Sequence, residues 1–186
     1  AELALLDPLS DMVRPEVLTE PAYAIEPANP DRSFDRRRAR QALALLEEAG
    51  WVPGDDGMLR NAAGQTLEIE LLNASPLFDR IINPYVENLQ AIGIDARLNR
   101  VDNAQFSQRE RDYDFDMITD HFPMSYEPGS GLRQYFGSAT ANESVFNPAG
   151  IADPAVDALV EAVVEAETQE ELSVAVSALD RVLRWE

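Results

Sequence analysis

Residues 67–101 read LEIELLNASPLFDRIINPYVENLQAIGIDARLNRV, and this stretch decides the fold class. Its first five positions alternate between apolar and acidic residues, which is the period of a half-buried strand. An apolar stripe at helical spacing follows in 77–92 and stops at Gly93, a residue type that commonly ends helices. Alternation resumes in 94–101. A strand, a helix and a second strand form a βαβ unit, so we expect two parallel strands joined by a right-handed crossover. The stripe consists of Phe78, Ile81, Ile82, Tyr85, Leu89 and Ile92.

The residues around this unit extend it into an α/β domain. Apolar residues at helical spacing in 39–49 predict a helix before it, and the turn at 61–64 predicts a hairpin or short loop. Alternation in 113–118 predicts a third strand after it, and 132–136 predicts a short helix. The fold class that follows is α/β, with a small mixed sheet and flanking helices.

Two further helices are predicted from their N-terminal signals. Asp153 followed by Pro154 suits the N-cap and first position of one helix. Thr168 and Glu171 have the spacing of a capping box at the start of the other. The pattern of this last helix still runs at Trp185 without a stop signal, which suggests that the natural sequence continues.

Residues 1–32 are rich in proline, which fixes φ and removes a backbone donor. We therefore expect an extended segment that lies along a neighbouring body. The prolines recur at Pro8, Pro15, Pro21, Pro27 and Pro30.

Composition excludes several classes of function. The 186 residues carry a net charge of −19, which repels the phosphates of nucleic acids and anionic lipids, so we expect no nucleic-acid partner. There is no Cys and a single histidine, His121, and no G-x-S-x-G motif accompanies it. No glycine-rich phosphate loop is present either. We expect no enzyme activity and no cofactor.

Two charged clusters leave alternatives open. Asp112, Asp114 and Asp116 would share one strand face, where they could bind calcium or form a polar face paired with nearby arginines. The first turns of the helix that begins after Ser33 carry Arg36, Arg37, Arg38 and Arg40, which could bind phosphate or form a solvated, ion-paired face. We favour the second interpretation of each cluster, so no metal site is predicted.

The loop after the third strand is the candidate ligand site, because open α/β sheets bind ligands beyond the carboxyl ends of their strands. Phe122 and Tyr126 would form walls, while Ser125 and the Gly129 backbone would supply polar contacts. Arg133 could pair with a ligand carboxylate. The full set of candidate ligand-binding residues is His121, Phe122, Met124, Ser125, Tyr126, Gly129 and Arg133.

An ordered set of short motifs across residues 34–186 resembles the C-terminal part of extracellular solute-binding protein family 5, which includes oligopeptide, dipeptide and nickel binders. Within this family the chain is most similar to the YejA-like branch. The motifs include ARQAL and LLEEAGW in 39–51, GQTL in 64–67, NLQAIGI in 88–94, RVDNAQF in 100–106, YDFDM in 113–117, FGS in 136–138, DPAVD in 153–157 and LDRVL in 179–183.

The resemblance implies a two-lobed periplasmic protein that closes on a peptide and passes it to the membrane permease of an ABC transporter. Residues 33–186 would be an incomplete ligand-binding lobe, and the N-terminal lobe of the same chain would lie outside this sequence. Many family members carry an acidic residue in the loop after the third strand, where it pairs with the peptide's amino group. That position is Met124 here, so either Asp120 or Glu127 replaces the acidic residue or the ligand is a modified peptide. The alternatives are a carboxylate-based hydrolase and a non-catalytic interaction domain.

Overall fold

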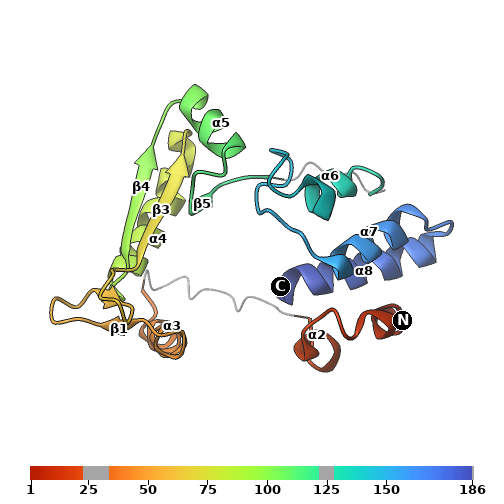
Figure 1. Ribbon diagram of the computed structural model, residues 1–186, viewed down its shortest axis with the longest axis horizontal. Helices are drawn as coiled ribbons and strands as arrows, with labels where there is room; N and C mark the ends of the chain where they lie inside the picture. The colour runs from red at the N-terminus through yellow and green to blue at the C-terminus, as the bar shows by residue number, and fades with distance from the viewer. Residues whose placement is uncertain (23–33, 122–127, 186) are drawn as a thin grey trace. The chain divides into compact units, whose positions relative to one another are not determined.

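The computed structural model describes residues 1–22, 34–121 and 128–185, and its chain forms two compact units (Figure 1). Unit 1 combines residues 1–26 with 121–186, and unit 2 contains residues 27–120. The proline-rich segment therefore contributes its first part to the unit that also holds the C-terminal helices. Among the helices described, none is both long and apolar enough to cross a lipid bilayer.

Unit 2 is built on a three-stranded parallel sheet, and the predicted βαβ unit is confirmed. The strands are β3 (Glu68–Asn73), β4 (Asp95–Arg100) and β5 (Met117–Ile118), in the order β4-β3-β5. Helix α4 (Asp79–Gln90) joins β3 to β4, which lie side by side in Figure 1. Position 71 of β3 is in register with position 98 of β4 and position 117 of β5.

The third strand is shorter than the predicted 113–118 because its first residues do not reach β3. Tyr113 has a φ of 53°, which turns the chain where an extended residue was expected. The side chain of Asp116 then accepts the Glu70 backbone N–H at 2.8 Å, so a carboxylate takes the place of a strand partner. Backbone pairing begins only at Met117.

The two connecting helices cover opposite faces of this sheet. Leu71 packs in a buried cluster with Ile82 and Val86 of α4. Its neighbour Glu70 forms an ion pair with Arg109 of α5 (Asn103–Arg111). Successive strand residues point to opposite faces, so α4 and α5 lie on different sides of β3.

The apolar stripe predicted for 77–92 is only partly correct. Ile82 and Val86 are buried and Leu89 packs beside them, but Ile81 and Tyr85 are exposed on the same helix. Residues 76–78 form a short 3-10 turn ahead of α4, which leaves Phe78 exposed as well. The buried face of α4 is therefore narrower than the stripe.

The rest of unit 2 precedes the sheet. Helix α3 (Arg36–Glu48) is capped by Asp35, whose side chain accepts two backbone N–H groups. A small antiparallel pair, β1 (Val52–Pro53) and β2 (Leu59–Arg60), follows it. The predicted α/β class with flanking helices is confirmed, and the parallel and antiparallel strands form two separate small sheets instead of one mixed sheet.

Unit 1 is helical, and the extended conformation expected for residues 1–32 is wrong over its described part. Helices α1 (Glu2–Leu6) and α2 (Pro15–Thr19) occupy residues 1–22 together with the 3-10 turn at Asp7–Leu9. Pro8 and Pro15 stand at the first positions of helical segments, where a missing N–H removes no intrahelical bond. Proline thus starts these short helices instead of preventing them.

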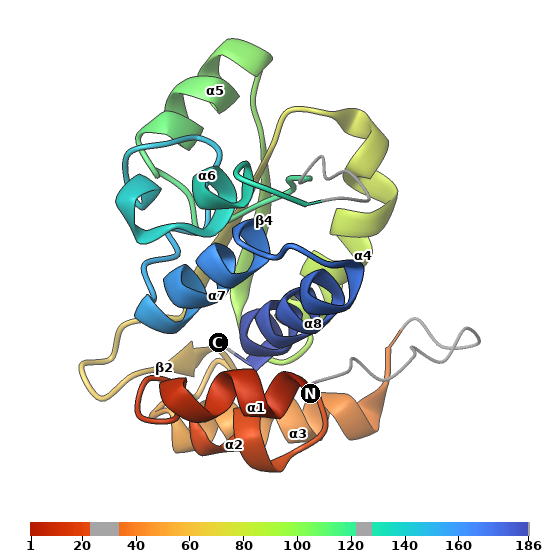
Figure 2. The ribbon, with the colours of Figure 1, turned by 90° about the vertical axis from the view of Figure 1, so that its right-hand side faces the viewer.

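The C-terminal part of unit 1 matches its predicted helices. These are α6 (Leu132–Phe136), α7 (Pro154–Val164) and α8 (Gln169–Trp185). Asp153 caps α7 through two backbone N–H groups, and Thr168 with Glu171 forms the predicted capping box at α8. Figure 2 shows α1 and α2 beside α8, and the buried leucines and valines of these helices form one core.

Candidate ligand-binding site

The carboxyl edge of the sheet in unit 2 has the geometry of a ligand crevice. The chain leaves β3 through α4 to reach β4 on one side, then crosses back through α5 to β5 on the other side. Because α4 and α5 cover opposite faces, the helices diverge beyond the ends of β3 and β5. Open α/β sheets bind their ligands at such a topological switch point.

A small apolar groove opens at this place, which we call the α4/β5 groove. Its volume is about 180 Å³. Among the described residues that line it, only Tyr85 and Thr119 have a polar side-chain N or O atom, and none is charged. The lining consists of Leu71 and Leu72 from β3, Ile81, Ile82 and Tyr85 from α4, and residues 117–119.

The groove has a buried floor and an exposed rim. Leu71, Leu72 and Ile82 are almost completely buried, whereas Ile81 is 62 % exposed and Tyr85 43 % exposed. Beyond the rim, the exposed apolar surface continues over Leu77 and Phe78. Apolar surface gathered in this way is typical of a binding site rather than of a solvated face.

Polar groups at the end of β3 hold the edge in one conformation. The Asn73 side chain is buried, and it donates to the Ser75 carbonyl at 2.9 Å and accepts the Ser75 N–H at 3.2 Å. Ser75 Oγ accepts the Leu77 N–H in turn. These polar groups are hydrogen-bonded to one another, and they fix the backbone between the end of β3 and the start of α4.

The opposite face of the sheet carries an ion-pair network that fixes α5 and β5. Arg109 Nη2 lies 2.7 Å from a carboxylate oxygen of Glu70 and its Nε lies 2.8 Å from Asp114. Asn99 donates to the second Glu70 oxygen at 2.9 Å. Burial raises the pKa of Glu70, but the hydrogen bonds from Arg109 and Asn99 lower it more, so the net pKa is lowered.

This network predicts a pH-dependent contribution to stability. The pKa of Glu70 is lower in the folded state than in the unfolded chain, where it is about 4.3. The contribution is therefore present above that value and is lost as the pH falls through the folded pKa. We expect Glu70→Gln to lower the free energy of unfolding by about 1–2 kcal/mol at pH 7 and by less at pH 3.

Urea unfolding followed by Trp51 fluorescence measures this effect, and Glu68→Gln is the matched control. Glu68 lies on the same strand, but its side chain is 60 % exposed and 3.8 Å from Arg97. We expect almost no change for the control at either pH. An equal deficit of the Glu70 variant at pH 7 and pH 3 would contradict the ion-pair assignment.

The structure describes only part of the predicted ligand loop. Phe122, Met124, Ser125 and Tyr126 lie outside the described residues. His121 is exposed and follows Thr119 and Asp120, directly beyond β5.

The two remaining candidates belong to unit 1. The carbonyl of Gly129 accepts the Leu132 N–H at 3.0 Å in the turn before α6. Arg133 forms a bidentate ion pair with Glu161 of α7, at 2.7 and 2.5 Å. A ligand carboxylate would have to replace Glu161 to bind this guanidinium.

Sequence reasoning missed the groove. The helical spacing predicts that Ile81 and Tyr85 are buried in the core stripe, and the alternation in 113–118 predicts only that Met117 lies in a strand. The available signal was the width of the stripe, because a single helix over two strands cannot bury six large side chains on one face.

The calcium alternative for the aspartates is contradicted within residues 1–22, 34–121 and 128–185, where no three acidic or histidine side chains are grouped closely enough to hold a metal ion. Asp112 accepts the Gln108 amide, Asp114 pairs with Arg109, and Asp116 accepts a backbone N–H of β3. The three carboxylates are thus engaged with three different partners.

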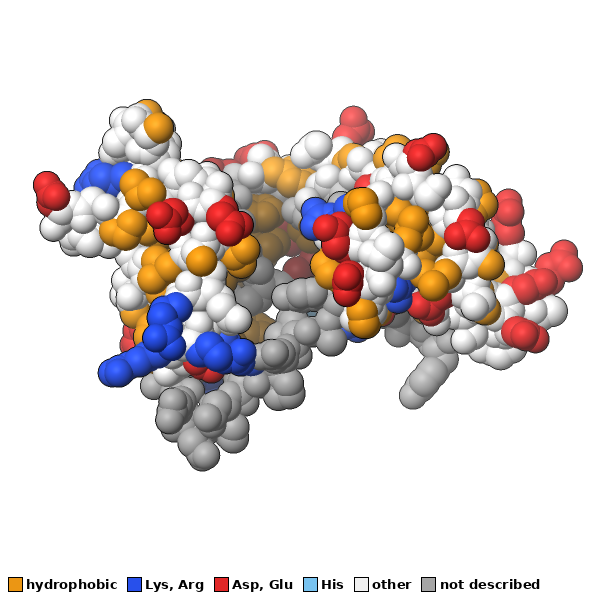
Figure 3. Space-filling view, turned by 90° about the horizontal axis from the view of Figure 1, so that it is seen from below, with side chains coloured by type: hydrophobic (Ala, Val, Ile, Leu, Met, Phe, Trp, Pro, Cys, Tyr) orange, Lys and Arg blue, Asp and Glu red, His pale blue; other side chains and the backbone are white. Residues whose placement is uncertain are grey.

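The arginines of α3 lie on an exposed or half-exposed surface, and basic side chains gather over the part of Figure 3 where α3 lies. Arg38 is 3.8 Å from Asp35, and the pKa of Asp35 is lowered, first by the backbone N–H groups of Arg37 and Arg38. These contacts agree with an ion-paired face.

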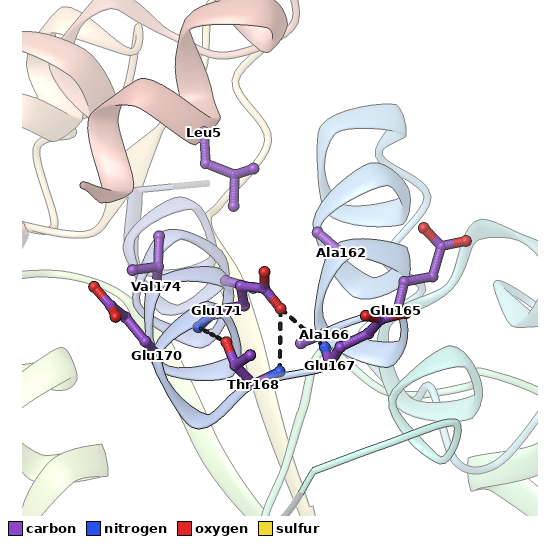
Figure 4. Close-up of a pocket in the computed structure, with 10 residues that line it drawn as sticks. Leu5, Ala162, Glu165, Ala166, Glu167, Thr168, Glu170, Glu171 and Val174 are labelled. Carbon is purple, nitrogen blue, oxygen red and sulfur yellow. Dashed lines mark hydrogen bonds between the residues drawn. The ribbon is translucent and has the colours of Figure 1, made fainter.

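Unit 1 has a larger depression of about 730 Å³ between α1 and the turn that joins α7 to α8 (Figure 4). Leu5 and Ala162 lie at its apolar side, and glutamates dominate the rest. Glu171 accepts the backbone N–H of Thr168, and the Thr168 hydroxyl accepts the N–H of Glu171. The capping box explains these two residues without a ligand.

A parallel α/β unit with an apolar crevice at its switch point belongs to the class of ligand-binding α/β domains. The model of the family "Bacterial extracellular solute-binding proteins, family 5 Middle" matches residues 13–144. The chain belongs to this family.

Two curated relatives match almost the whole chain. The probable peptide-binding protein YejA of Agrobacterium fabrum is 40 % identical over 183 residues, which cover 98 % of this chain and 30 % of the relative. The protein y4wM of Sinorhizobium fredii is 39 % identical, with 98 % of this chain and 27 % of the relative covered. The chain therefore spans less than a third of the length of these relatives.

Three solved structures are similar in fold. AppA of Bacillus subtilis in complex with a nonapeptide has a TM-score of 0.67 at 17 % identity, covering 97 % of this chain and 36 % of AppA. NikZ of Campylobacter jejuni in complex with Ni(L-His) has a TM-score of 0.67 at 17 % identity, covering 99 % of this chain and 37 % of NikZ. A periplasmic oligopeptide-binding protein of Thermotoga maritima with bound mannohexaose has a TM-score of 0.66 at 18 % identity, covering 79 % of this chain and 29 % of that protein.

Proposed function

We propose that the natural protein is the substrate-binding component of an ABC importer, which binds peptides or modified peptides in a cleft between two lobes. The observation that carries this proposal is the apolar crevice at the switch point of a family 5 chain. Its partners would be the ligand, the remaining lobe of the same protein and the membrane permease, and its location would be the periplasm. The chain would act by binding and release, without catalysis.

The loop of residues 121–130 would contribute to the same cleft. His121, Phe122 and Tyr126 would form walls and Ser125 and Gly129 polar contacts, together with Met124 and Arg133. Met124 supplies no charge for a free amino group, so an N-modified peptide fits this position better. Arg133 would bind a ligand carboxylate only if that carboxylate replaced Glu161 as its partner. In the absence of the ligand, the ion pair with Glu161 holds the guanidinium in a fixed orientation.

The alternatives make different demands on the carboxylates. A hydrolase needs acids that are available to a substrate, whereas Glu70, Asp114 and Asp116 each have a partner within 3 Å. A non-catalytic interaction domain would need no crevice at the strand ends. Both alternatives therefore explain less of the unit 2 geometry than peptide binding does.

The test of this function is titration calorimetry on the full-length protein with free and N-acylated peptides. We expect binding, with Tyr126→Ala and Arg133→Ala each weakening it by at least about tenfold, which is 1.4 kcal/mol. Glu161→Gln is the control for Arg133, because it frees the guanidinium and should preserve or improve affinity. Unchanged affinity in both alanine variants would remove the loop from the site, and absence of peptide binding would overturn the function.

A further inference from the structure

We propose that the α4/β5 groove is a selective subsite that accepts one apolar side chain of the peptide ligand. The inference rests on the proposed function and adds to it the chemical class of residue that the ligand presents. The described residues that line the groove all belong to unit 2.

The size of the groove limits its occupant. Sites that enclose a whole small ligand have volumes of about 300–1,000 Å³. The α4/β5 groove has about 180 Å³, which is several times the share of liquid volume that one water molecule takes, about 30 Å³. It therefore has room for a part of a ligand, such as one side chain, while the rest of the ligand lies outside.

The lining determines the chemistry of the occupant. Leu71 and Ile82 form a buried floor whose side chains offer neither a hydrogen-bond donor nor a charge. A sugar hydroxyl or a charged side chain would lose its water there without gaining a partner, which is unfavourable. Burial of an apolar side chain there would be favourable, because it removes apolar surface from water. Met117 on the rim has a flexible thioether that can adjust to aliphatic side chains of different shape.

The groove lies at the carboxyl edge of the sheet. Thr119 lines it at the end of β5, and Asp120 follows in the same unit. A peptide whose main chain runs along 119–120 would have its side chains within reach of the groove. Open α/β sheets bind their ligands beyond the carboxyl ends of their strands, and this position of an apolar groove carries the inference.

The test compares peptides that differ at one position. Alanine-based peptides of the length that the full-length protein binds would carry Leu, Ser or Asp at each position in turn, and a neutral oligosaccharide would be titrated beside them. At one position we expect Leu to bind at least about tenfold more tightly than Ser, and Asp more weakly than Ser.

The matched variants are Ile81→Asp and Leu77→Asp. Both side chains are strongly exposed, 62 % and 77 %, so neither change should affect folding, but only Ile81 lines the groove. We expect Ile81→Asp to reduce the preference for Leu over Ser to about one. Leu77→Asp should retain the preference for Leu over Ser, because Leu77 does not line the groove.

The outcomes separate this inference from the proposed function. Peptides that bind without any preference at any position would overturn the subsite and leave peptide binding standing. An equal loss of the Leu and Ser peptides in Ile81→Asp would also overturn the subsite. If no peptide binds, or if only the oligosaccharide does, the proposed function and the subsite are both wrong.

Discussion

Replacement of Arg181 by alanine is expected to destabilise unit 1 by about 3 kcal/mol. Arg181 is a charged residue of α8 that is only 7 % exposed. Its Nε donates to the Val17 carbonyl at 2.5 Å, one Nη donates to the Glu20 carbonyl, and the other donates to Glu2 at 3.0 Å. One guanidinium thus joins α8 to both N-terminal helices.

The size of the effect follows from what the substitution leaves behind. The last carbonyls of a helix have no partner within the helix, and Arg181 supplies partners at the end of α2. Without it, two backbone carbonyls and the Glu2 carboxylate lose their donor. An unsatisfied buried group costs about 1–3 kcal/mol, and loss of one member of a buried ion pair costs about 3–5 kcal/mol.

Arg184→Ala is the control on the same helix. Arg184 is half exposed and pairs with Asp180 one turn away, so its removal should change stability by no more than about 0.5 kcal/mol. Chemical unfolding in a Trp51→Phe background would follow unit 1 through Trp185, which packs against its core. Equal unfolding midpoints for the two variants would show that Arg181 does not hold the N-terminal helices.

Replacement of Gly93 by alanine is expected to destabilise unit 2 by about 3 kcal/mol. Gly93 has a φ of +89°, and a Cβ at this position would collide with the Gly57 carbonyl oxygen. The backbones are held close here, because the Leu59 N–H donates to the Gly93 carbonyl at 2.7 Å. Conformational strain of about 1–2 kcal/mol therefore adds to a clash that the backbone cannot easily relieve.

Gly64→Ala separates the two contributions. Gly64 has a φ of +78° and nothing within 4 Å of an added Cβ, so strain alone applies. We expect a loss of about 1 kcal/mol for Gly64→Ala and clearly more for Gly93→Ala. Trp51 fluorescence in a Trp185→Phe background would report unit 2. Similar losses for both variants would mean that the contact with Gly57 relaxes freely.

The features that were predictable from the sequence are those with local causes. The βαβ unit follows from alternation on both sides of a helical stripe that ends at Gly93. The capping of α7 by Asp153 and the capping box of Thr168 follow from residue types at fixed spacing. Each of these interactions joins residues a few positions apart, so the local pattern contains all of its members.

The same local rules give a wrong prediction where one sequence pattern is compatible with two conformations. The prolines in residues 1–22 predict an extended segment, but Pro8 and Pro15 begin helical segments in a part of the chain that packs against α8. The contact between Arg181 and the Glu20 carbonyl joins positions 161 residues apart. A pattern read along the chain cannot contain such a partner.

The α4/β5 groove was decided by the tertiary structure. The apolar character of Ile81, Tyr85 and Met117 was plain in the sequence, and it predicted burial. Their exposure depends on the two-residue length of β5, which results from the turn at Tyr113 and the bond from Glu70 to Asp116. The sequence by itself therefore determined that these residues are apolar and where the strands and helices begin. Only packing of β5 against β3 determined that they line an open groove, because that pairing joins residues 46 positions apart.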